Sequence, residues 1–159
     1  MNLSRESAEF ISIICRRIKP EKVLEIGTFN GYSALWLSLF SKKVITLEID
    51  EKNIELALKN FKKAENRNIE IISGDAKESL KKLKYKFDII FIDAKKSEYK
   101  DYLELSLKLL DKNGVIFVDN TISHKESLKE FFNYLEKSSL YYRELNLGKG
   151  LIIIGNKVF

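Results

Sequence analysis

The chain has 159 residues, of which 45% are hydrophobic and 32% charged, and its 28 Lys and Arg residues outnumber its 23 Asp and Glu residues. This length predicts a single domain over residues 1–159 that buries roughly two thirds of the surface exposed by the unfolded chain. The apolar runs are far shorter than the roughly 20 residues that cross a bilayer, and the charged N-terminus is not typical of a signal peptide. We therefore expect a soluble cytoplasmic protein with no membrane partner, whose net charge of +5 weakly favours anionic partners.

An N-terminal helix is predicted within residues 1–20. Apolar residues recur there on one helical face: Ile11, Ile14 and Ile18. Pro20 ends the helix, because proline disfavours helical geometry in the residue before it. The only cysteine, Cys15, cannot form an internal disulfide, and we interpret it as a buried structural thiol, since no nucleophile signature surrounds it. Exposed apolar residues of this helix could also pair two chains as a homodimer.

Six apolar segments predict β-strands, and a seventh does so more weakly. The six are Val23–Ile26, Val44–Leu47, Ile69–Ile72, Phe87–Ile92, Val115–Val118 and Leu151–Ile154, and the weaker one is Tyr141–Leu145. Amphipathic stretches of helical period separate most of them. Strands that alternate with helices predict an α/β fold with a doubly wound, mainly parallel, Rossmann-like sheet of seven strands. The near-continuous apolar run of Phe87–Ile92 is typical of a central strand.

Capping and turn residues predict where these elements begin and end. We expect Asp50 and Ser97 to be N-caps, and Asn113-Gly114 to close the helix before the fifth strand. Residues 146–150 separate the last two predicted strands. This short connection predicts that the sheet closes with an antiparallel hairpin instead of a crossover.

The segment Val23 to Ser33 predicts a buried strand, a glycine-bearing turn and a helix. In open α/β sheets, ligands bind beyond the carboxyl ends of the strands. The residues found there are Gly27 to Gly31, Glu48, Gly74, Asp75, Asp93, Asp119 and Asn120. Glu48 follows Gly27 at about the 20-residue spacing that lets a carboxylate accept both hydroxyls of a ribose. An ordinary surface acid is the alternative for Glu48, and the Gly-x-x-x-Gly spacing disfavours a dinucleotide.

Asp93 and the pair Asp119-Asn120 follow the fourth and fifth strands, which we expect to be neighbours. Two carboxylates and an amide, completed by water, suit a hard divalent ion such as Mg²⁺. Asp119-Asn120 could instead cap a helix or form a turn. His124, just beyond this pair, is interpreted as a surface residue at a helix start and not as a metal ligand.

The pattern Glu25-x-Gly27-x-x-x-Gly31, followed by Tyr32-Ser33, resembles the first motif of the class I S-adenosylmethionine-dependent methyltransferases. The resemblance extends through the acidic residues after the next strands to the C-terminal hairpin. Within that superfamily the chain resembles the cation-dependent O-methyltransferases related to catechol and caffeoyl-CoA O-methyltransferase. The segments that carry this narrower resemblance are 31–33, 91–99, 118–120 and 148–151.

The resemblance implies that S-adenosylmethionine and Mg²⁺ are the cofactors. The residues expected to bind the methyl donor are Glu25, Gly27, Phe29, Gly31, Ser33, Glu48, Ile49, Gly74, Asp75, Ala76 and Asp93, with Asp75 to Lys77 bordering the adenine. The expected metal ligands are Asp93, Asp119 and Asn120, and Lys96 is the expected catalytic base. The adjacent Lys95 leaves that choice open, and a solvated loop lysine is the alternative for Lys96.

The leading hypothesis is a Mg²⁺-dependent O-methyltransferase that acts on a chelating, catechol-like hydroxyl of a small molecule. Only 22 residues precede the first predicted strand, where relatives carry a longer helical cap, and Ala94 and Lys95 replace aromatic residues of the relatives. An open mouth and a positive charge could admit tRNA, so a hydroxyuridine O-methyltransferase is the second hypothesis. A cofactor-binding module with weak or partner-dependent catalysis is the third, and a nucleotide-sugar or dinucleotide enzyme is a distant fourth.

Overall fold

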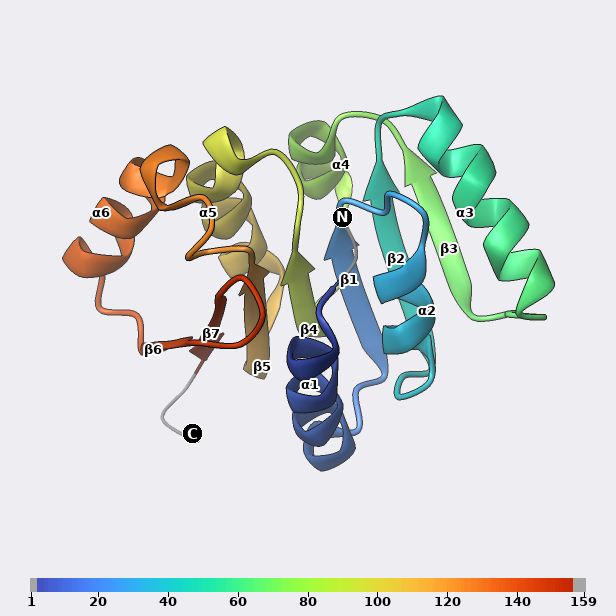
Figure 1. The fold of residues 1–159 in the computed structure, drawn as a ribbon, viewed down its shortest axis with the longest axis horizontal. Coiled ribbons are helices and arrows are strands. Elements are labelled where there is room, and N and C mark those ends of the chain that lie inside the picture. Colours follow the sequence, from blue (N-terminus) through green and yellow to red (C-terminus); the bar gives the residue numbers. More distant parts are fainter. Residues whose placement is uncertain (1–2, 156–159) are drawn as a thin grey trace.

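The computed structural model describes residues 3–155, so the outermost residues of the expected domain, 1–2 and 156–159, lie outside the described part. Seven strands form one sheet in the order β3-β2-β1-β4-β5-β7-β6 (Figure 1). The strands are β1 Lys22–Ile26, β2 Lys43–Glu48, β3 Ile69–Ser73, β4 Phe87–Ile92, β5 Leu110–Asp119, β6 Tyr142–Leu145 and β7 Leu151–Gly155. Strands β1 to β5 are parallel, and β7 runs antiparallel to both β5 and β6. The predicted α/β class and the closing hairpin are therefore confirmed.

Helices cover both faces of the sheet (Figure 1). They are α1 Arg5–Ile18, α2 Tyr32–Ser38, α3 Glu51–Lys63, α4 Ala76–Lys82, α5 Tyr99–Leu109 and α6 Lys129–Lys137, with short 3₁₀ helices η1 Lys96–Glu98 and η2 Lys125–Leu128. Helices α1 to α3 pack on one face and α4 to α6 on the other. Because strand side chains alternate between faces, β4 sends Phe91 into the first layer and Ile90 and Ile92 into the second. The fourth strand lies at the centre of the sheet, as predicted.

Helix α1 has the predicted apolar face. Ser4 caps it by accepting a hydrogen bond from the Ser7 backbone N–H at 3.1 Å, and Ile11 and Cys15 are buried against the sheet. Burial raises the pKa of the Cys15 thiol to about 12, which fits a structural thiol. No helix within residues 3–155 has the length and apolar character needed to cross a membrane.

The predicted caps have mixed outcomes. Asp50 caps α3 by accepting hydrogen bonds from two backbone N–H groups of its first turn, at 2.8 and 3.3 Å. The prediction for Ser97 is wrong, because this residue lies inside η1, which runs directly into α5. The prediction for Asn113-Gly114 is also wrong, since both residues lie within β5. A Cβ on Gly114 would lie 2.7 Å from Leu110 Cδ1, so this glycine relieves crowding within an irregular strand and ends no helix.

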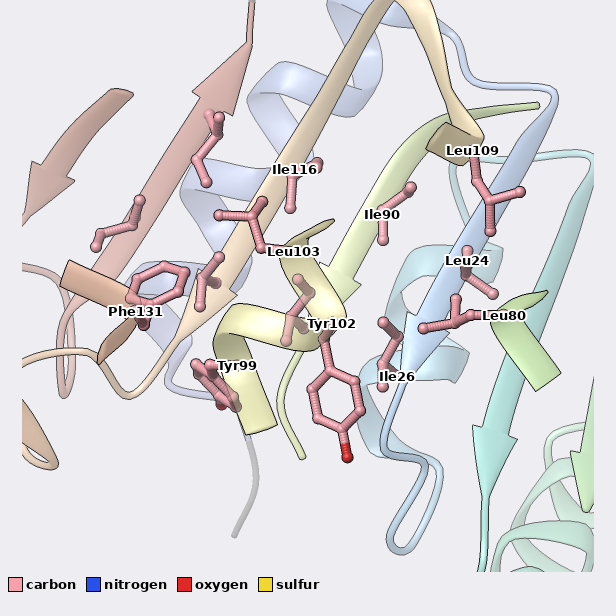
Figure 2. Close-up of a cluster of buried hydrophobic side chains, with 14 of the residues drawn as sticks. Leu24, Ile26, Leu80, Ile90, Tyr99, Tyr102, Leu103, Leu109, Ile116 and Phe131 are labelled. Atoms are coloured by element: carbon pink, nitrogen blue, oxygen red, sulfur yellow. The ribbon is translucent and has the colours of Figure 1, made fainter. Parts of the chain in front are cut away.

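The core layer between the sheet and α5 fixes the start of α5 beneath the strand ends (Figure 2). Tyr99, the first residue of α5, is fully buried, and its ring meets Phe131 edge to face with the centroids 6.0 Å apart. Burying a large apolar side chain contributes about 1.5–3 kcal/mol to folding. This packing holds the residues that precede and begin α5 close to the carboxyl ends of β4 and β5.

Candidate functional site

The turn after β1 needs glycine at its first position. Gly27 has a φ of +96°, and a Cβ there would lie 2.2 Å from the carbonyl oxygen of Asp93. Only glycine therefore lets this turn pass beside the end of β4. Phe29, two residues later, has a φ of +50°, which is unfavourable for a bulky side chain. Its N–H donates to Glu48 Oε2 at 2.9 Å, so the end of β2 supports the strained turn.

Glu48 presents a carboxylate whose position is set by backbone groups. Besides Phe29, the N–H groups of Ile49 and Asp50 donate to its Oε1, at 2.9 and 3.0 Å. A carboxylate has about four acceptor positions, so Oε2, which receives one of these bonds, retains capacity for another donor. This arrangement suits a hydroxyl group, such as that of a ribose.

A cavity of about 470 Å³ runs along the carboxyl ends of the central strands. Of the residues predicted to bind the methyl donor, it is lined by Gly27, Phe29, Ser33, Glu48, Ile49, Gly74, Asp75, Ala76 and Asp93. Lys95, Lys96, Asn120 and His124 line the same cavity. Its volume falls in the range of about 300–1,000 Å³ that is usual for small-molecule sites. Nine of the eleven predicted cofactor residues and the candidate base therefore face one space.

Gly31 and Glu25 do not line this cavity. A Cβ on Gly31, whose φ is +78°, would lie 2.4 Å from Phe61 Cε1, so this glycine lets α2 pack closely against α3. Asp75 lines the cavity but also accepts a hydrogen bond from the Glu78 N–H at 3.0 Å, which caps α4. Gly31 and Asp75 thus each have a structural role that does not depend on a bound cofactor.

Glu25 is fully buried next to the cavity floor. Its Oε2 accepts a hydrogen bond from Thr46 Oγ1 at 2.5 Å, while Oε1 has no hydrogen-bond partner among residues 3–155. Burial raises the pKa of this carboxyl to about 8, against the effect of the nearby Ser33 and Thr46 hydroxyls, and the charges of Asp93 and Glu48 raise it further. A nearby positive charge would favour ionisation of this buried carboxyl group, so the free oxygen, Oε1, fits a cationic ligand group such as an ammonium.

The structure brings Asp93, Asp119 and Asn120 together, as the sequence predicted. Asn120 follows β5 with a φ of +63°, a conformation that asparagine tolerates, and its Nδ2 donates to Asp93 Oδ1 at 2.8 Å. The same group lies 3.3 Å from Asp119 Oδ2. Burial, and then the charge of Asp93, raises the pKa of Asp119 to about 6. These two carboxylates, Asp119 buried and Asp93 half-buried, repel each other and would be stabilised by a cation.

The donor set fits a hard divalent ion that retains water. Within residues 3–155, no three His, Cys, Asp or Glu side chains gather as a metal cluster. The two carboxylates could offer oxygen ligands here, and the Asn120 amide oxygen could join them after rotation of the amide. Mg²⁺ usually keeps several waters and binds through one or two carboxylates, so these residues meet its requirements.

The two adjacent lysines have different surroundings. Lys96 Nζ donates to Asp93 Oδ1 at 2.7 Å and to the Tyr99 hydroxyl, and its side chain is only 16% exposed. Lys95 Nζ instead lies 3.1 Å from Glu98 Oε1, and its side chain is 69% exposed. The geometry therefore favours Lys96 over Lys95 as the base, a choice that the sequence left open.

Several residues of the site had no role assigned from the sequence. Tyr102 and Glu98 line the cavity together, and the Tyr102 hydroxyl donates to Glu98 Oε2 at 2.6 Å. Tyr99 contacts Lys96. The two residues are three positions apart, and a helix expected over them would have predicted this contact from the sequence. His124 precedes η2, as predicted for a helix start, and it also lines the cavity.

A family model described as O-methyltransferase matches residues 1–146. A catechol O-methyltransferase of Mycobacterium tuberculosis is 34% identical over 125 residues, which cover 76% of this chain and 57% of that protein. A caffeoyl-CoA O-methyltransferase of Medicago sativa is 32% identical over 165 residues, covering 96% and 67%. The crystal structure of SAH-bound methyltransferase PaMTH1 from Podospora anserina superimposes with a TM-score of 0.89 and 28% identity, over 97% of this chain and 79% of that one. The chain thus spans less than two thirds of the length of the Mycobacterium relative.

Proposed function

This chain belongs to the O-methyltransferase family, and from that premise we propose that it transfers the methyl group of S-adenosylmethionine to a hydroxyl oxygen. One observation carries the proposal. A single cavity joins Glu48, which can accept a ribose hydroxyl, to the cluster of Asp93, Asn120 and Lys96, which can hold an acceptor. The relatives named above and the SAH-bound neighbour support this choice of donor and reaction.

The methyl donor would lie along the ends of β1, β2 and β4. Glu48 would accept a ribose hydroxyl, and the unpartnered Oε1 of Glu25 would attract the ammonium of the methionyl part. Ile49 and Ala76, which line the same cavity, would border the adenine. S-adenosylmethionine supplies a methyl group on a positively charged sulfur, which an oxygen nucleophile attacks.

The acceptor would be a small molecule with two adjacent hydroxyls, as in a catechol. Asp93, Asp119 and Asn120 would hold Mg²⁺, which supplies the positive charge that makes an acceptor hydroxyl easier to ionise. Lys96 Nζ, in its neutral form, would take the proton from that hydroxyl as general base. Holding donor and acceptor in one cavity would lower the barrier further.

The experiment that tests this proposal follows the labelled methyl group of S-adenosylmethionine into catechols and into unmodified tRNA, each with Mg²⁺ or with EDTA. We expect label in catechols that depends on Mg²⁺. Transfer that persists in EDTA would contradict the metal part of the proposal. Absence of transfer to any acceptor, despite tight binding of S-adenosylhomocysteine, would favour a cofactor-binding module instead.

A tRNA hydroxyuridine O-methyltransferase is a second candidate. The exposed Lys95 at the cavity and the net charge of +5 favour an anionic acceptor, and label in tRNA would support it. A homodimer through the exposed Ile13 of α1 and a cytoplasmic location stay predictions. Sedimentation of the purified protein would test the first, and fractionation of the source cells the second.

A further inference from the structure

We propose that Tyr99 is a positioning residue that holds Lys96 Nζ beside Asp93 and thereby aims the catalytic base at the acceptor. This inference rests on the proposed role of Lys96. It concerns a residue that contributes no atom to the cavity lining and acts only through Lys96.

The ring of Tyr99 is immobilised by packing. The side chain is fully buried, and its neighbours in the core layer include Leu103 of the same helix and Phe131, which meets the ring edge to face (Figure 2). A ring held on its faces and edges cannot swing away without opening a cavity in the core. The hydroxyl oxygen at its tip therefore occupies a fixed position under the ends of β4 and β5.

The hydrogen bonds of this hydroxyl have a fixed direction. A phenol carries one proton, and the backbone carbonyl of Asp119, 3.2 Å away, can only accept it. Asp93 Oδ1 lies farther away, at 3.4 Å. With its proton directed at Asp119, the Tyr99 oxygen turns its lone pairs toward Lys96 Nζ and accepts a hydrogen bond from it.

Lys96 needs this second contact because its other anchor has competing partners. Asp93 Oδ1 accepts hydrogen bonds from both Lys96 and Asn120, and Asp93 is also a proposed metal ligand. A lysine side chain has four rotatable bonds, and an anchor at one end alone leaves many rotamers accessible. The Tyr99 hydroxyl is neutral and is fixed by the core, so it can hold Nζ in place whatever else Asp93 binds.

The Tyr99→Phe variant removes the hydroxyl and keeps the packed ring. The matched control is Tyr134→Phe, on α6, which removes a hydroxyl from a half-buried tyrosine against the same core layer but outside the cavity lining. We expect kcat of Tyr99→Phe to fall about tenfold, because a small misplacement of a general base is costly. The KM for S-adenosylmethionine and the affinity for S-adenosylhomocysteine should stay within twofold, and the control should keep the kcat of the parent protein.

A chemical-labelling measurement tests the same inference without any acceptor. Reductive methylation modifies exposed lysine amines, and mass spectrometry of a peptide that contains Lys95 and Lys96 reports both rates at one pH. In the parent protein Lys96, held by two groups, should react more slowly than Lys95. In Tyr99→Phe the Lys96 rate should rise severalfold while the Lys95 rate stays the same.

The two measurements separate failure of this inference from failure of the proposed function. If the parent protein transfers methyl groups to no acceptor, the labelling still decides whether Tyr99 holds Lys96. Equal labelling of Lys96 in the parent and Tyr99→Phe proteins would overturn the inference. Equal loss of kcat in Tyr99→Phe and Tyr134→Phe would overturn it as well, because a general effect of hydroxyl removal on the core would then explain both.

Discussion

The Nζ of Lys96, the first residue of η1, lies 2.7 Å from Oδ1 of Asp93, which directly follows β4. This ion pair places the lysine amine beside the group that would hold the acceptor. The neighbouring Lys95 extends to Glu98 instead. Substitution of the two lysines should therefore have different effects on activity.

We expect Lys96→Ala to lower kcat for methyl transfer by about 100-fold or more, the usual contribution of a general base. Lys95→Ala should lower kcat far less, because its amine points to Glu98 and not to Asp93. Steady-state kinetics on one acceptor, with both variants at the same pH, measures the difference. A larger loss in Lys95→Ala than in Lys96→Ala would contradict this prediction and would support Lys95 as the base.

The metal proposal predicts a change in thermal stability that requires no turnover. Mg²⁺ should raise the melting temperature of the parent protein, because a ligand that binds only the folded state stabilises it. Asp119→Ala, which removes a buried carboxylate of the cluster, should abolish this increase. Asp111→Ala, at the other end of β5, is the matched control and should retain it. An equal Mg²⁺ effect in all three proteins would place the ion elsewhere.

Glu25 predicts a pH dependence of stability. Its folded-state pKa of about 8 lies above the ordinary value of 4.5, so between these pH values the folded protein holds a proton that the unfolded chain has released. The contribution of this group to the free energy of unfolding is therefore fully present below pH 4.5 and declines as the pH rises toward 8. Glu25→Gln removes this decline, so its advantage over the parent protein should grow from pH 5 to pH 8 and then level off.

Urea denaturation at several pH values measures this difference. The exposed Glu51 of α3 offers a matched control, because Glu51→Gln removes a carboxylate without changing the buried position. Glu25→Gln should also bind S-adenosylhomocysteine more weakly, despite its greater stability at high pH. A pH-independent difference between Glu25→Gln and the parent would show that the carboxyl is ionised throughout.

Alanine substitutions at Gly27 and Gly74 distinguish the cost of backbone strain from the cost of a steric clash. Gly74→Ala introduces a side chain at a φ of +133° with open space around the new Cβ, so its cost should be the backbone strain alone, about 1–3 kcal/mol. Gly27→Ala adds a contact of 2.2 Å with the Asp93 carbonyl oxygen and should cost clearly more. It should also abolish cofactor binding, because the turn must shift. Denaturation curves and calorimetric titration with S-adenosylhomocysteine measure both effects, and equal destabilisation by the two substitutions would contradict the packing argument.

Regular elements were predictable because they depend on local pattern. The apolar run of Phe87–Ile92 has the length and composition of a strand buried on both faces, and Asp50 has the side chain that caps a helix. The prediction that Asn113-Gly114 ends a helix was wrong, because an irregular pairing between β4 and β5 places this dipeptide within a strand. Ser97 was mistaken for a similar reason, since the 3₁₀ turn around it continues into α5.

The sequence by itself determined the order of strands and helices and the polar residues near the carboxyl ends of the strands, because hydrophobic periodicity and turn chemistry act over a few neighbouring positions. Only the tertiary structure favoured Lys96 over Lys95 as the base, left Glu25 Oε1 without a hydrogen-bond partner among residues 3–155, and buried the Tyr99 ring whose hydroxyl contacts Lys96. Burial and hydrogen-bond direction depend on side chains that meet across the sheet and from different helices, and neighbouring sequence does not specify them. The glycine turn beside β4 depends on both: the sequence pattern predicted the turn, and only the fold shows how closely Gly27 approaches the Asp93 carbonyl oxygen.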